Sequence, residues 1–138
     1  MTMRSLAPIY DDNHKLVLGC TGRSIFEACG VCGAYHSPIN TCPHEDIRWS
    51  FTKWKHNSGF KAERHLYNFW FAAKLIRESR IAILTESTGN VWRLEECGFQ
   101  NSLGTFGAHL TDDQRLKLDS SGALSLILLY DPDKAGEE

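Results

Sequence analysis

Three carboxylates in the second half of the chain stand where apolar segments end. Glu86 follows the apolar run 81–85, and Asp131 and Asp133 follow the run 124–130. In an open parallel sheet, ligands bind just beyond the carboxyl ends of the strands, so neighbouring strands would bring these acids to one edge. Three carboxylates that close repel one another unless a cation lies among them, and Mg²⁺ (or Mn²⁺) suits oxygen ligands and phosphate. The pattern predicts a metal site there; the alternative is that the acids are solvated strand ends.

A loop in the first third of the chain, which we call the cysteine loop (residues 29–42), carries a second set of candidate metal ligands. Four nitrogen and sulfur ligands within a short loop suit a tetrahedral structural Zn²⁺. Cys20 or His44 would be able to replace one ligand, and the alternative is a set of free buried thiols. The predicted zinc ligands, spaced C-x2-C-x3-H-x5-C, are Cys29, Cys32, His36 and Cys42.

A third stretch, which we call the basic segment (Arg48–Arg64), interleaves cations with aromatic rings. Single-stranded nucleic acid is held by cations along its backbone and by aromatic faces under its bases. Alternate residues of a strand share one face, so most of these rings are better explained as core. The cations that remain as candidates for nucleic-acid binding are Lys53, Lys55 and Lys61.

Composition and charge limit the class of protein. The 138 residues suffice for one compact domain, and their apolar and charged fractions of 42% and 23% are typical of globular proteins. No apolar run is long enough to cross a bilayer and no secretory signal is evident, so we expect a cytoplasmic protein. Residues 1–80 contain eleven Lys and Arg against seven Asp and Glu, whereas residues 81–138 contain four against ten. A basic half suits a polyanion and an acidic half suits divalent cations; two ordinary solvated surfaces are the alternative.

The elements that must position these side chains follow from hydrophobic periodicity. From residue 81 onward, strands and helices alternate with short joints, which predicts an α/β fold with a parallel sheet flanked by helices. Thr111 and Gln114 have the spacing of a capping box. The last strand is apolar enough to be buried on both faces. The expected strands are 15–20, 48–55, 81–85, 101–106 and 124–130, and the expected helices are 63–80, 89–97 and one that begins after Thr111.

The acidic motif, read with its neighbours, resembles a known family. Asp131-Pro132-Asp133-Lys134-Ala135-Gly136, after a strand that ends in Glu86, is similar to the Toprim fold of primases, topoisomerases, some nucleases and recombination proteins. Within that family the chain is most similar to the primases of bacteria and phages. The segments that carry this resemblance are Gly22-Arg23, Asn57-Ser58, Lys61, Leu66-Tyr67-Asn68, Ala73-Lys74, residues 101–107, Leu110-Thr111 and Gln114.

The resemblance implies primer synthesis, which is templated nucleotidyl transfer on single-stranded DNA from nucleoside triphosphates, with a replicative helicase as a further partner. Asp131 and Asp133 would hold Mg²⁺, and Glu86 would be another metal ligand or a general base. Arg23 and Asn57 join the lysines as predicted contacts to template or triphosphate. The rivals are a Toprim nuclease or topoisomerase that cleaves phosphodiesters, and a non-catalytic module that binds single-stranded nucleic acid.

The same resemblance implies a division of the chain and shows some departures. A small β-rich, zinc-bearing lobe is expected over residues 1–56 and the Toprim core over residues 57–138. Ser87 stands where the family usually has glycine, and Asn90 stands where it has aspartate. The chain stops at Glu138, where the family normally continues, so we expect weak metal affinity and little or no primer synthesis from these residues alone.

Overall fold

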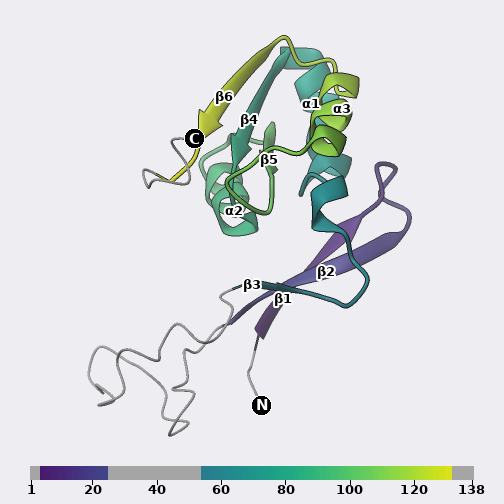
Figure 1. Cartoon of the computed structure of the whole chain (residues 1–138). Helices are drawn as coiled ribbons and strands as arrows, with labels where there is room; N and C mark the ends of the chain where they lie inside the picture. The colour runs from purple at the N-terminus through teal and green to yellow at the C-terminus, as the bar shows by residue number, and fades with distance from the viewer. Residues whose placement is uncertain (1–3, 25–53, 132–138) are drawn as a thin grey trace, which may run out of the picture. The chain divides into compact units, whose positions relative to one another are not determined.

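The computed structural model describes residues 4–24 and 54–131 (Figure 1). Contacts divide the chain into two compact units, one of Met1–Pro8 with Gly19–Phe60 and one of Ile9–Leu18 with Lys61–Glu138. The predicted domain boundary between residues 56 and 57 stays a prediction. The elements, in chain order, are β1 (Arg4–Tyr10), β2 (Val17–Ser24), β3 (Trp54–His56), the 3-10 helix η2 (Ala62–Arg64), α1 (Phe69–Ser79), β4 (Ile81–Thr85), α2 (Thr88–Glu96), β5 (Ser102–Gly104), α3 (Asp112–Ser120) and β6 (Ser125–Leu129).

The N-terminal strands form a small sheet in the order β1-β2-β3. The strands β2 and β3 are antiparallel, with Thr21 opposite His56 and Arg23 opposite Trp54. The expected N-terminal β-rich region is therefore confirmed, although β1 was not predicted. The part of the predicted strand 48–55 that precedes Trp54 lies outside the described residues, as does the whole cysteine loop.

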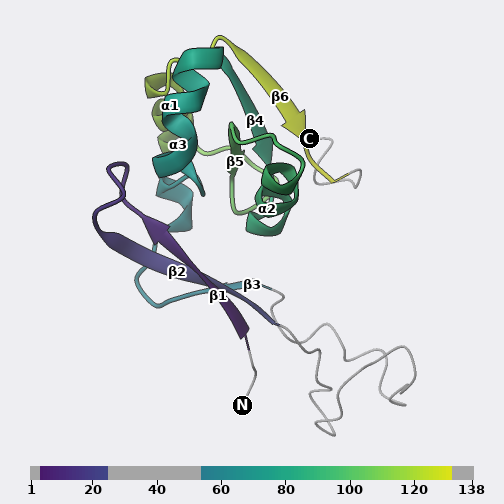
Figure 2. The same ribbon diagram turned by 180° about the vertical axis from the view of Figure 1, so that it is seen from behind.

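The second sheet has the order β5-β4-β6, and both pairings are parallel. Figures 1 and 2 place α1 and α3 on one side of this sheet and α2 on the other. Since connections between parallel strands are right-handed, α2 after β4 and α3 after β5 must lie on opposite faces when the chain reverses direction along the sheet. The predicted α/β fold with a parallel sheet flanked by helices is confirmed.

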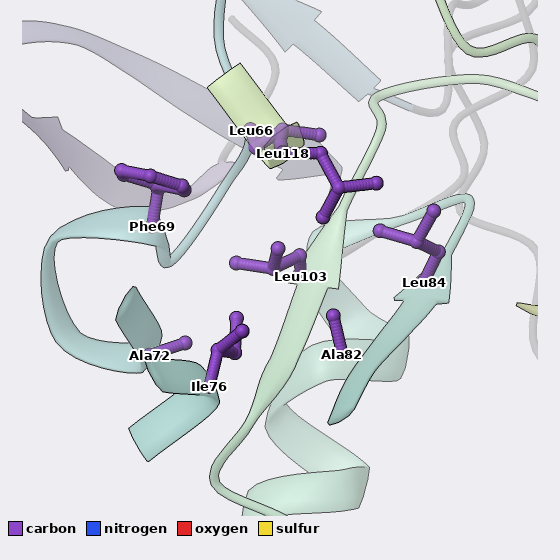
Figure 3. Close-up of a cluster of buried hydrophobic side chains, with 8 residues drawn as sticks. All are labelled: Leu66, Phe69, Ala72, Ile76, Ala82, Leu84, Leu103 and Leu118. Atoms are coloured by element: carbon purple, nitrogen blue, oxygen red, sulfur yellow. The ribbon is translucent and has the colours of Figure 1, made fainter. Parts of the chain in front are cut away.

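A core of buried side chains fixes α1 and α3 against one face of this sheet (Figure 3). Ala82 and Leu84 alternate along β4 and face the cluster, whereas Ile83 between them points to the other face. Each fully buried leucine or isoleucine stabilises the fold by about 1.5–3 kcal/mol. The cluster comprises Leu66, Phe69, Ala72, Ile76, Ala82, Leu84, Leu103 and Leu118.

The predicted helix 63–80 is wrong at its beginning. Residues Ala62–Arg64 form the separate 3-10 helix, and α1 begins only after Asn68, whose φ of 69° is left-handed. Asparagine tolerates that conformation better than most residues, so it interrupts the helical periodicity. The Nδ2 atom of Asn68 donates to Ser102 O at 3.2 Å and to Glu95 Oε1 at 2.9 Å, which holds the turn against β5 and α2.

The prediction that the last strand is buried on both faces is also wrong. All five residues of β6 are exposed, with Leu128 at 62%. Among the described residues β6 pairs with β4 alone and is the edge of the sheet. A run of apolar residues shows that a strand lacks a polar face, but it does not say what covers the strand. In the part of the chain that the structure describes, no helix is long and apolar enough to span a membrane.

Candidate functional site

The carboxyl ends of β4 and β6 bring two of the three predicted acids together. Thr85 pairs with Leu129 at the end of the parallel ladder, and Glu86 and Asp131 follow within two residues. The backbone N–H of Asp131 donates to Glu86 Oε1 at 3.0 Å. The prediction that the Glu86 and Asp131 strands are parallel neighbours is confirmed, and Asp133 lies outside the described residues.

The turn after Glu86 explains how this sequence tolerates its departures from the family pattern. Ser87 has an extended backbone, with φ −125° and ψ 153°, so the position does not require glycine. Its hydroxyl oxygen accepts the Asn90 N–H at 3.3 Å and caps α2. Asn90 therefore lies in the first turn of α2, close in sequence to Glu86, where its amide adds no negative charge to the site.

The end of β5 lies beside the end of β4 and completes this edge. The Thr105 N–H donates to Thr85 O at 2.9 Å. The Thr105 hydroxyl has one hydrogen, which it donates either to Thr85 O at 3.0 Å or to Gly107 O at 2.6 Å. These contacts fix the backbone just before Phe106 and Gly107.

A buried tyrosine supports the β5 end from the side. Tyr67 forms a two-way backbone bridge with Gly104, with N···O distances of 2.8 and 3.2 Å. A Cβ atom at residue 104 would lie 3.2 Å from the Tyr67 Cβ, so only glycine fits there without displacement. Trp92 Nε1 donates to the Tyr67 hydroxyl at 3.0 Å, and burial raises the pKa of Tyr67.

The donor chemistry of the edge fits a hard divalent cation. Glu86 is half-buried and Asp131 is exposed, and both offer carboxylate oxygens, the ligands that Mg²⁺ prefers. Within residues 4–24 and 54–131 no group of three or more His, Cys, Asp and Glu side chains forms a ready metal site. Any complete ligand set must therefore draw on water, on substrate phosphate or on residues outside those ranges, among them Asp133.

The predicted nucleic-acid contacts fall mainly in the first compact unit. The guanidinium of Arg23 lies over the Trp54 ring, 5.6 Å from its centroid, and Lys55 is exposed on β3. Asn57 Oδ1 accepts the Cys20 N–H at 2.7 Å, so this side chain holds β2 to the segment after β3. Lys61 is exposed at the start of the second unit, and Lys53 lies outside the described residues.

Sequence reasoning missed Phe106 at this edge. Its φ of 63° is left-handed, which is unusual for a bulky side chain. A Phe-Gly pair directly after a strand is a weak signal of such a turn, because the glycine suggests where positive φ is needed. The structure places that conformation on the phenylalanine instead.

Comparison with protein families adds an independent finding. Residues 80–138 match the Toprim domain. The chain is 35% identical over 80 residues to the DNA primase of Helicobacter pylori strain J99, an alignment that covers 58% of this chain and 14% of the relative.

Solved structures agree with the sequence comparison. The Aquifex aeolicus primase, described as zinc-binding and RNA polymerase domains, is 28% identical with a TM-score of 0.69, and the match covers 97% of this chain and 28% of that one. A DnaG primase catalytic domain bound to single-stranded DNA has the same fold at 22% identity and a TM-score of 0.63, over 96% of this chain and 35% of that one. The chain thus spans between 14% and 35% of the length of these relatives.

Proposed function

We propose that residues 80–138, which match the Toprim domain and are similar to bacterial DNA primases, contribute the metal-binding core of an enzyme that synthesises primers on single-stranded DNA. The observation that carries the proposal is the placement of Glu86 beside Asp131. These two residues follow neighbouring parallel strands, and the backbone N–H of Asp131 donates a hydrogen bond of 3.0 Å to the Glu86 carboxylate. Two acids at the carboxyl edge of a parallel sheet suit a metal that binds phosphate.

Each acid has a distinct part in this proposal. Asp131 and Asp133 would hold Mg²⁺, which when bound would supply positive charge to the incoming triphosphate. Glu86 is either a further ligand or the general base that accepts the proton of the attacking 3′-hydroxyl. The hydrogen bond from Asp131 N orients Glu86 Oε1 and leaves Oε2 for one of these roles.

The relatives and the distribution of charge support a nucleic-acid substrate. A catalytic domain of the same fold is bound to single-stranded DNA, which supports that template for this chain. The excess of Lys and Arg in residues 1–80 supports contact with a polyanion, for which Arg23, Lys55 and Lys61 are candidates. The cysteine loop as a zinc site, and a replicative helicase as partner, are parts of the same proposal.

The metal site is tested first by direct binding. Mn²⁺ titration followed by electron paramagnetic resonance should show a site that Glu86→Gln weakens about tenfold or more, because the substitution removes one charged ligand or its electrostatic support. Asp119→Asn is the matched control, since Asp119 is an exposed acid on α3 and its loss should leave the affinity unchanged. Equal Mn²⁺ affinity in wild type and Glu86→Gln would refute the site.

The reaction is tested by product. The full-length protein, given a single-stranded template, nucleoside triphosphates and Mg²⁺, should form short primers, and Asp131→Asn should abolish them. A nuclease would instead shorten labelled single-stranded DNA without triphosphates, with the same dependence on Asp131. A non-catalytic module would bind the DNA and do neither.

A further inference from the structure

The first turn of α2 carries backbone N–H groups that no described residue accepts. The helix begins at Thr88, directly after the Ser87 cap, and the first N–H groups of a helix have no acceptor within it. The Ser87 hydroxyl accepts the N–H of Asn90 at 3.3 Å. Within residues 4–24 and 54–131, the N–H groups of Thr88 and Gly89 find no acceptor. These donors and the positive end of the helix dipole favour an anion.

The side chain of Thr88 adds a further donor to the same turn. Thr88 is only 2% exposed, and its hydroxyl forms no hydrogen bond in the part of the chain that the structure describes. A buried hydroxyl without a partner destabilises the folded chain, so a ligand that accepts from it would explain its presence. The Cα–Cβ bonds of a helix tilt toward its N-terminus, so a side chain at the first helical position extends toward the end of the helix. An anion bound to the N–H groups of this turn is therefore within reach of the hydroxyl.

The turn adjoins the two acids of the candidate metal site. Glu86 directly precedes the Ser87 cap, and its Oε1 accepts the Asp131 N–H at 3.0 Å. The first turn itself contains no acid. Because the Glu86 carboxylate alone repels an anion, the turn binds one only together with a cation at the two acids. A phosphate group meets both conditions, since its oxygens bind Mg²⁺ and also accept N–H and O–H donors.

We propose that the first turn of α2 binds a phosphate group of the substrate through the N–H groups of Thr88 and Gly89 and the Thr88 hydroxyl. This inference rests on the proposed function, which places a metal at Glu86 and Asp131, and it adds the groups of the protein that hold the phosphate. The phosphate belongs either to the nucleoside triphosphate or to the DNA strand, and both present the same oxygens.

Two substitutions at Thr88 isolate the contribution of the hydroxyl. Thr88→Val keeps the shape of the side chain and removes the donor, whereas Thr88→Ser keeps the donor. Because the hydroxyl has no partner among the described residues, Thr88→Val should be at least as stable as wild type in urea denaturation. Thr21→Val is the matched control, since Thr21 is 1% exposed in the first compact unit and its hydroxyl also lacks a partner.

Binding to the full chain is measured by titration calorimetry in excess Mg²⁺, with inorganic tripolyphosphate and single-stranded oligo(dT) as separate probes. A hydrogen bond to a charged group contributes about 1.5–3 kcal/mol, so Thr88→Val should weaken the probe that occupies this turn about 10- to 150-fold. Thr88→Ser and Thr21→Val should bind as wild type does. Loss for tripolyphosphate assigns the phosphate to the triphosphate, and loss for oligo(dT) assigns it to the DNA strand.

The proposal is overturned if Thr88→Val binds both probes as tightly as wild type does, or if wild type binds neither. It is equally overturned if Thr88→Ser loses as much affinity as Thr88→Val, because the hydroxyl would then not be the cause. The proposed function is read separately, from Mn²⁺ affinity without any phosphate. Thr88→Val should leave that affinity unchanged, whereas an unchanged affinity in Glu86→Gln would refute the metal site itself.

Discussion

Gln114 on α3 is the side chain whose replacement should show most clearly what fixes α3 to the segments around Thr105 and His65. It is 1% exposed, and its Oε1 accepts the Thr111 N–H at 3.1 Å in a complete capping box. Its Nε2 faces three carbonyl oxygens, those of Thr105 at 2.8 Å, His65 at 2.9 Å and Ala62 at 3.3 Å. An amide nitrogen has two hydrogens, so two of these bonds form at a time.

Gln114→Leu removes two donated bonds and one accepted bond while keeping most of the side-chain volume. A buried polar group that loses its partner costs about 1–3 kcal/mol. Since Thr105 O is buried and the other groups are partly buried, we expect a loss of about 3–5 kcal/mol in the free energy of unfolding. Gln114→Glu should lower the free energy of unfolding at pH 7 by at least as much, because an ionised carboxylate cannot donate a hydrogen bond to the carbonyls. Part of this stability should return at acidic pH, where the carboxyl group is protonated.

Urea denaturation followed by tryptophan fluorescence measures these changes. With a slope of about 1–3 kcal/mol per molar urea, the midpoint of Gln114→Leu should fall by about 1–5 M. Leu116→Gln on the same helix is the control: Leu116 is 62% exposed, and its replacement should change stability by about 0.5 kcal/mol or less. A loss below about 1 kcal/mol for Gln114→Leu would show that the three carbonyls find other partners.

Four further outcomes are expected. Elemental analysis should give about one zinc per chain, and a chelator should selectively loosen residues 20–45, because bound metal supplies local folding energy; metal-free protein with reduced cysteines would contradict this. Replacing Lys53, Lys55 and Lys61 together with alanine should flatten the salt dependence of single-stranded DNA binding, since each neutralised phosphate releases counterions; an unchanged slope would mean that these cations are only solvated. Burial lowers the folded-state pKa of His65, so the stability it contributes is complete above the unfolded pKa of about 6.5 and is lost as the pH falls below it. His65→Asn should therefore flatten the loss of stability between about pH 6.5 and 5, and an unchanged profile would point to other groups. The exposed apolar edge of β6 should cause association that rises with concentration, and Leu128→Lys should reduce it in light scattering because charge on an edge strand opposes pairing; equal masses for both proteins would contradict this.

The local sequence pattern was enough to predict β4, the strand that Glu86 follows, and the start of α3. The run 81–85 became β4 with the predicted bounds, and Glu86 follows it directly. The capping box of Thr111 and Gln114 formed as predicted. Both depend on interactions between residues only a few positions apart, which the order of the amino acids specifies almost completely. Alternation of strands and helices with short joints likewise requires a parallel sheet, because a short crossover leaves few other arrangements.

Tertiary structure alone decided which strand is the edge, what the buried polar groups contact and where the backbone is strained. The apolar composition of β6 predicted burial, yet the sheet order leaves the strand exposed in the part of the chain described. Gln114 satisfies carbonyls up to 52 residues away, and no local pattern encodes such partners. Phe106 adopts a left-handed backbone that local preference would assign to Gly107. Steric preferences act within one residue, whereas the path of the chain between β5 and α3 is set by hydrogen bonds to Thr85 and Gln114, and these outweigh the local cost.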